Sequence, residues 1–148
     1  MTPQQAFKKS ALHILSQRSR CRSKDEQICL YRSPKGDEAC AVGILLPKKL
    51  GEALDQARIG SWGVIKSEAS LLNRRHSTRS SAGHKAACQA VKKLAGIPDG
   101  LLYELQAIHD LSRGSSRHSS RSKADKVKIR LELISLGQRF DLDVSFLG

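Results

Sequence analysis

The side chains best suited to chemistry in this sequence are arginines and lysines set among serines in three short segments. They read "RSRCRSK" at 18–24, "RHSTRS" at 75–80 and "RHSSRS" at 117–122. An Arg guanidinium is a planar fork of donors that fits phosphate or carboxylate, and Ser and Thr hydroxyls add donors for phosphate oxygens. The three segments therefore predict contacts with an anionic partner.

Basic residues concentrate in and around these segments. Fifteen of the 26 Lys and Arg residues fall within residues 18–24, 74–85 and 113–130. One such stretch is usually a solvated loop, but three in one small chain favour a functional basic surface. The candidate residues for binding nucleic acid or another anionic partner are Arg20, Arg22, Arg75, Arg79, Arg117, Arg121, Lys123 and Lys126.

The whole chain has the charge of a polyanion-binding protein. Its 148 residues carry a formal net charge of +12, which favours nucleic acid, a nucleoprotein complex or an acidic protein face as partner. Aromatic residues are only 4% of the chain, too few for a row of base-stacking platforms. We find no segment that would span a membrane and no signal peptide, so we expect a cytoplasmic protein. The composition does not favour DNA over RNA as the partner, and it does not predict an oligomeric state.

Metal and cofactor sites are not expected. The four cysteines form no C-x-x-C pair, so buried reduced thiols are favoured over a zinc site. Asp141 and Asp143 would share one face of an extended segment, but no third carboxylate joins them to hold Mg²⁺. A Walker loop and a G-x-G-x-x-G motif are both absent from the sequence.

One set of residues suggests nucleophilic catalysis. Cys40, His109 and Asp110 are of the types that serve as thiol nucleophile, base and orienting carboxylate. The mechanism requires the thiol and the imidazole to lie within hydrogen-bond reach. A buried structural Cys40 is the competing interpretation, and a cysteine-dependent enzyme stays open as a third hypothesis.

The expected scaffold is a single α+β domain over residues 1–148. Four or five helices would pack with a short antiparallel β-hairpin, whose strands would be Ile28–Arg32 and Ala39–Leu45 around the turn "SPKGD". Residues 74–84 and 112–122 would be flexible Ser/Arg-rich loops.

Helices are expected near 2–17, 48–57, 84–96, 98–111 and 123–137. Thr2 and Gln5 have the spacing of a capping box at the first of these helices. In the last helix we expect an inward stripe of Val127, Leu131 and Ile134, with Gly137 ending the helix. Residues 139–148 would then form a half-buried strand or an extended tail.

Two longer segments carry a resemblance to a family. "CLYRSPKGDEACAVGILLP" at 29–47 and "LLYELQAIHDL" at 101–111 resemble small, mostly uncharacterised proteins of phage and prophage genomes, with C-x-Y-R, C-A-[IV]-G-x-L-[IL]-P and L-Q-x-I-H-D motifs. The matching positions are Cys29, Tyr31, Arg32, Cys40, Ala41, Val42, Gly43, Leu45, Pro47, Leu105, Gln106, Ile108, His109 and Asp110. The Ser/Arg segments and Lys48–Lys49 depart from that pattern.

The resemblance implies a phage-type accessory protein that works in the cytoplasm of a bacterial host. Many such proteins act on host defence or on nucleic-acid machinery. The leading functional hypothesis rests on the basic segments: non-catalytic binding of nucleic acid or a nucleoprotein complex through the Arg/Lys-rich loops. The alternative is a protein-directed inhibitor of host defence, of the anti-CRISPR kind, that covers an acidic face of an effector.

Overall fold

Every regular element that the structure describes is helical. The computed structural model describes residues 1–17, 30–33, 38–71, 81–111 and 122–148. The α-helices are α1 (Pro3–Ser16), α2 (Lys48–Gln56), α3 (Trp62–Ser70), α4 (Ser81–Lys93), α5 (Asp99–Asp110) and α6 (Lys123–Arg139), and two 3₁₀ turns are η1 (Gly43–Leu45) and η3 (Ser145–Leu147). The α+β prediction is wrong, because these ranges contain six α-helices and no strand.

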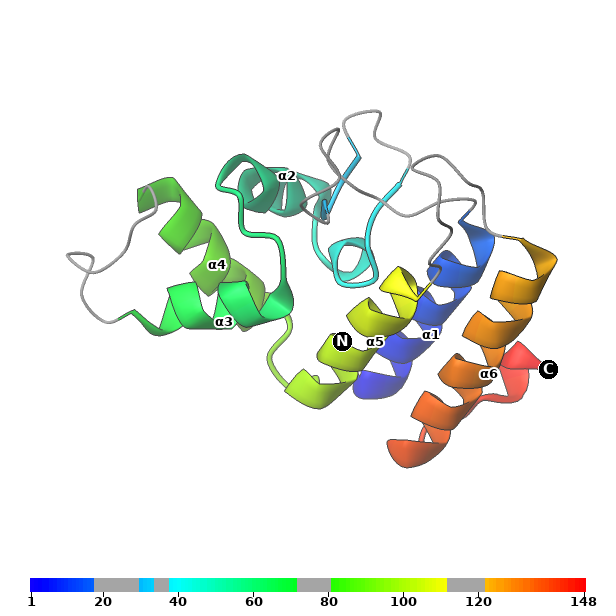
Figure 1. Ribbon diagram of the computed structural model, residues 1–148. Coiled ribbons are helices and arrows are strands. Elements are labelled where there is room, and N and C mark those ends of the chain that lie inside the picture. Colours follow the sequence, from blue (N-terminus) through cyan, green and yellow to red (C-terminus); the bar gives the residue numbers. More distant parts are fainter. Residues whose placement is uncertain (18–29, 34–37, 72–80, 112–121) are drawn as a thin grey trace.

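The helices form two groups that share one core. Helices α1, α5 and α6 lie side by side, while α4 packs against both α2 and α3 (Figure 1). Helix α3 also contacts α5 and so connects the groups. The buried apolar side chains of both groups belong to one continuous cluster. None of the described helices is long and apolar enough to cross a membrane.

The segment predicted to be a β-hairpin is held by side chains of two helices instead. The backbone amides of Tyr31 and Arg32 donate to the two carboxylate oxygens of Asp55, at 2.8 and 2.9 Å. On the other side, the Ala39 carbonyl accepts from the side chains of His13 and Gln17. Two paired strands use their backbone amides and carbonyls to hydrogen-bond each other. Here these groups are already bonded to side chains, so they are not available for a β-ladder.

The second predicted strand turns into a 3₁₀ helix. The amides of Ile44 and Leu45 donate to the carbonyls of Cys40 and Val42 within the same segment. Gly43 allows the close approach that this turn requires, because a Cβ there would lie 2.1 Å from the Tyr31 carbonyl oxygen. The apolar residues of 39–46 are therefore buried by a compact turn, except for Ile44, which is partly buried. Apolar composition alone does not distinguish such a turn from a strand.

The first helix begins as predicted. Thr2 Oγ1 accepts from the Gln5 amide at 3.2 Å, and the Thr2 amide donates to Gln5 Oε1 at 2.9 Å. The capping box is therefore confirmed, and Pro3 occupies the first turn.

The last helix does not end at Gly137. It continues to Arg139, and Gly137 is buried within it, where a Cβ would lie 2.3 Å from Val144 Cγ1. The chain then reverses with Asp141 at a φ of 52°. Residues 139–148 are therefore not a strand. They fold back so that the rings of Phe146 and Phe7 pack edge to face, with their centroids 5.8 Å apart.

Helix α6 also faces the core with a different side from the one predicted. Ile129, Leu133 and Leu136 are buried, whereas Val127 and Leu131 are 61% and 62% exposed. The predicted stripe is wrong because α6 carries apolar residues on two opposite faces, and packing on α1 and α5 selects the other one.

Candidate anion-binding surface

The basic residues nearest the predicted site lie at the start of α6. Ser122 caps this helix: its Oγ accepts from the Asp125 amide at 3.1 Å, and its own amide donates to Asp125 Oδ2 at 2.9 Å. The helix thus begins at Lys123 and is set immediately beside the second Ser/Arg segment in the sequence. The Asp125 carboxylate is committed to the cap and also suits the positive end of the helix dipole.

Three cations share one side of this helix. Lys123, Lys126 and Arg130 follow the i, i+3, i+7 spacing, so they form a stripe along about 10 Å of the helix axis. Lys123 and Arg130 are exposed and Lys126 is partly exposed. None of the three makes an ion pair with a carboxylate in the described part of the chain. We call these residues the α6 stripe.

Lys123 and Lys126 are the two predicted site residues that the structure describes. Arg20, Arg22, Arg75, Arg79, Arg117 and Arg121 all lie outside the described residues. The described ranges contain 15 basic and 11 acidic residues, and the remaining segments contain 11 basic and 3 acidic residues. Two thirds of the net charge of +12 therefore belongs to segments that connect the helices.

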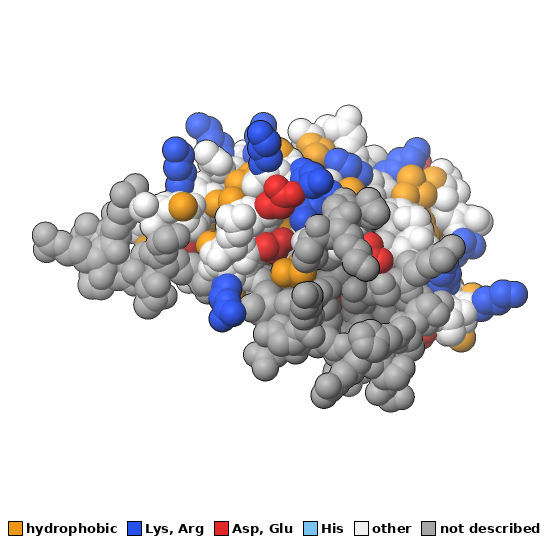
Figure 2. Space-filling model, turned by 90° about the horizontal axis from the view of Figure 1, so that it is seen from above, with side chains coloured by type: hydrophobic (Ala, Val, Ile, Leu, Met, Phe, Trp, Pro, Cys, Tyr) orange, Lys and Arg blue, Asp and Glu red, His pale blue; other side chains and the backbone are white. Residues whose placement is uncertain are grey.

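Basic side chains on the described helices are spread out rather than gathered in one patch. Figure 2 shows Lys and Arg side chains across one face of the molecule, with acidic side chains between some of them. Several are paired: Lys66 lies 3.1 Å from Asp99, and Arg139 lies 3.2 Å from Glu104. Other exposed lysines of the described residues, such as Lys9, Lys49 and Lys128, also lack an ion pair, so the α6 stripe is distinguished by its spacing along one side of a capped helix.

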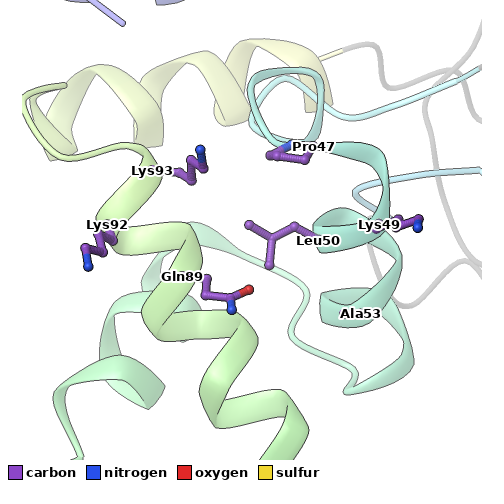
Figure 3. Close-up of a pocket in the computed structure, with 7 residues that line it drawn as sticks. All are labelled: Pro47, Lys49, Leu50, Ala53, Gln89, Lys92 and Lys93. Atoms are coloured by element: carbon purple, nitrogen blue, oxygen red, sulfur yellow. The ribbon is translucent and has the colours of Figure 1, made fainter.

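Sequence reasoning missed a pocket between α2 and α4. It has a volume of about 670 Å³ and a partly apolar lining. Figure 3 shows Leu50 and Gln89 pointing into the space between the two helices, with the Lys93 side chain extending toward Pro47. The residues that line it are Pro47, Lys49, Leu50, Ala53, Gln89, Lys92 and Lys93.

Three of the seven lining residues are lysines and none is acidic. This arrangement suits a ligand or partner segment with an apolar body and a negative charge. In the sequence, the only indication of this pocket is the pair of Lys-Lys dipeptides at 48–49 and 92–93. That these dipeptides lie on two helices in contact follows only from the packing of α2 on α4.

The thiol and the imidazole proposed for thiol catalysis are both buried. Cys40 has no solvent exposure, and its sulfur accepts from the Gly43 amide at 3.3 Å. His109 is also fully buried, and its Nδ1 lies 3.1 Å from Asp110 Oδ1. Cys40 makes no hydrogen bond to His109, so the geometry does not supply the thiol–imidazole contact that this hypothesis requires.

The described residues also contain no group of three or more His, Cys, Asp or Glu side chains arranged to hold a metal ion. Asp143 instead accepts from the Ser145 amide at 2.8 Å. This hydrogen bond is the main reason that the pKa of Asp143 is lowered. The carboxylate is satisfied by its own turn.

Comparison with known proteins adds no family to this description. The chain matches no protein-family model, no curated protein and no solved structure. The resemblance to phage proteins therefore stays a prediction from the sequence motifs.

Proposed function

We propose that this protein binds nucleic acid or a nucleoprotein complex without catalysis, using the α6 stripe of Lys123, Lys126 and Arg130. The observation that carries the proposal is the stripe itself: three cations on one side of a capped helix, with no carboxylate partner among the described residues. Unpaired cations retain their full charge for a partner, because no intramolecular carboxylate has to be displaced first.

The spacing of the stripe fits a phosphate backbone. The three cations span about 10 Å of the helix axis, and long Lys and Arg side chains over that length can reach several phosphates of one strand. Because phosphate contacts fix position without reading sequence, we expect weak sequence preference. The phage-type accessory role implied by the sequence resemblance is compatible with such binding.

A protein-directed inhibitor is the second candidate, and a specific observation favours it. Val127 and Leu131 are exposed one turn apart on α6, beside the stripe. Phosphates gain nothing from aliphatic side chains, whereas an acidic protein surface with apolar residues would use both features. The target would then be an acidic face of a host-defence effector.

Fluorescence anisotropy with labelled 20-base-pair DNA, single-stranded DNA and RNA tests the leading proposal. The variant K123Q/K126Q/R130Q should bind the preferred nucleic acid at least about tenfold more weakly, because three phosphate contacts are lost. The control K9Q/K48Q/K85Q removes the same charge from exposed positions on α1, α2 and α4, and its affinity should fall much less.

The two candidates separate in a second experiment. Capture from nuclease-treated bacterial lysate should recover no stoichiometric partner if nucleic acid is the ligand. A partner protein that survives nuclease treatment and is lost with V127Q/L131Q would instead support the inhibitor. Equal affinity of both triple-charge variants for nucleic acid would contradict the leading proposal.

A further inference from the structure

A second thiol, Cys88, lies in a setting that the buried Cys40 lacks. It is exposed on α4, one helical turn after His84. The distance from Cys88 Sγ to His84 Nε2 is 3.5 Å, within hydrogen-bond range for sulfur. The thiol therefore combines solvent access with a neighbouring base.

A carboxylate on the neighbouring helix lies close to that base. His84 Nδ1 lies 3.5 Å from Glu68 Oε1, and Glu68 on α3 is 6% exposed. In the tautomer that carries its proton on Nδ1, the lone pair of Nε2 faces the sulfur. Nδ1 makes no hydrogen bond in the described part of the chain, so Glu68 acts on the imidazole through its charge. The buried carboxylate also stabilises the imidazolium that forms when His84 takes the thiol proton.

The competing contact of the sulfur is weaker. Cys88 Sγ lies 3.9 Å from the carbonyl oxygen of Ala69 on α3, near the limit for a thiol donor. In the neutral state the thiol can donate to either group. Once the proton has moved to His84, the sulfur is an acceptor and only the imidazolium contact remains favourable.

The charged side chains around this site are mostly cations. Lys85 and Lys92 lie three residues before and four residues after Cys88, and therefore on neighbouring positions of the same helix surface. Charged groups on the elements packed around this site are Lys66 and Glu68 on α3, Lys48, Lys49, Glu52 and Asp55 on α2, and Lys85, Lys92 and Lys93 on α4. Lys66 is paired with Asp99 and Lys48 with Glu52, which leaves an excess of cations.

We propose that Cys88 is a nucleophilic thiol, activated by His84 and Glu68, that is modified by low-molecular-weight disulfides. The His84 imidazole takes the thiol proton, and the Cys88 sulfur attacks one sulfur of the disulfide. A new S–S bond forms as the old one breaks, and the leaving thiolate takes the proton from His84. The products are a mixed disulfide at Cys88 and one free small thiol, so electrons and protons balance.

The test measures modification of each cysteine separately in the full chain. The protein is treated with iodoacetamide or with glutathione disulfide at neutral pH, and labelling of each cysteine-containing peptide is followed by mass spectrometry. Cys88 should react at least about tenfold faster in the wild type than in H84Q, because a neighbouring base typically contributes that much or more. The control H13Q removes a histidine on α1 and should leave the rate at Cys88 unchanged.

A pH series separates activation from a structural effect. At about pH 10 hydroxide ionises the thiol directly, so the wild type and H84Q should react at similar rates. E68Q should slow the reaction at neutral pH and not at high pH, as expected for a residue that acts through His84. Far-UV circular dichroism checks that both variants are folded.

Equal rates for wild type and H84Q at neutral pH would overturn the proposal. So would a rate defect in H84Q that persists undiminished at high pH, because it would indicate altered access rather than lost proton transfer. C88S must abolish labelling of this peptide. This inference is independent of nucleic-acid binding, so either one can fail alone.

Discussion

The carboxylate of Asp55 on α2 accepts a hydrogen bond from the backbone amide of Tyr31, 24 residues earlier in the chain, at 2.8 Å. Its second oxygen accepts from the next amide, Arg32, at 2.9 Å. One side chain thus satisfies two consecutive backbone donors and ties the segment before η1 to α2. This clamp takes the place of the β-ladder that the sequence predicted.

Removing the clamp should destabilise the protein. D55A leaves the two amides without their acceptor, and we expect a loss of about 2–4 kcal/mol in the free energy of unfolding. D55N keeps one oxygen acceptor and should lose less. Urea denaturation of the three proteins provides the measurement. A D55A variant within about 0.5 kcal/mol of wild type would show that the clamp is not important for stability.

The same carboxylate should make stability depend on pH. Burial is the largest influence on Asp55 and raises its pKa above 3.8, outweighing the two amide hydrogen bonds that lower it. A pKa raised by folding means that the folded protein binds the proton more tightly than the unfolded chain. The contribution of Asp55 is therefore greatest below pH 3.8 and falls as the pH rises through the raised pKa.

Unfolding free energies from about pH 3 to about pH 7 would show this effect as the difference between wild type and D55N. The difference should shift against the wild type as the pH rises, and then level off. A difference that moves in the wild type's favour would indicate that hydrogen bonding, and not burial, dominates this pKa.

Two helical glycines should respond oppositely to alanine. In G137A the new Cβ would lie 2.3 Å from Val144 Cγ1 and 3.0 Å from Phe7 Cζ, so the C-terminal segment must move. We expect a loss of about 1–3 kcal/mol from overpacking. G100A on α5 meets nothing closer than Phe140 Cζ at 3.4 Å, and it should be neutral or gain up to about 1 kcal/mol. Thermal denaturation would compare them, and equal effects would contradict the packing around Gly137.

The orientation of α6 can be tested with two leucines on opposite sides of the helix. L133A removes a fully buried side chain and should cost about 2–5 kcal/mol. L131A changes a side chain that is 62% exposed, and it should stay within about 0.5 kcal/mol of wild type. The reverse order would restore the orientation that the sequence pattern suggested.

Local signals in the sequence predicted the parts of the fold that depend on neighbouring residues. The capping box of Thr2 and Gln5 needs only three residues of spacing. The helix predicted near 98–111 likewise follows from a single local apolar stripe, whose members Leu101, Leu102, Leu105 and Ile108 are buried. Interactions between distant segments were missed. The amide of Tyr31 donates to the carboxylate of Asp55, 24 residues later in the chain, and no local sequence pattern predicts that hydrogen bond.

The candidate sites show the same division. The spacing of Lys123 and Lys126 on a helix was predictable, but their side of α6 was not, because apolar residues lie on both faces. The His84 and Cys88 spacing is visible in the sequence, whereas Glu68 joins them only through the packing of α3 on α4. The pocket of Lys49, Lys92 and Lys93 likewise requires α2 to meet α4.

The salt dependence of nucleic-acid affinity tests the central claim most directly. For the preferred nucleic acid, the dissociation constant of wild type and of K123Q/K126Q/R130Q would be measured across a series of salt concentrations. If the α6 stripe contacts duplex phosphates, the slope of log K against log[salt] should be shallower in the variant by about 2.7, or about 0.9 for each lost contact. Parallel slopes, or a wild-type affinity that does not change with salt, would contradict the account.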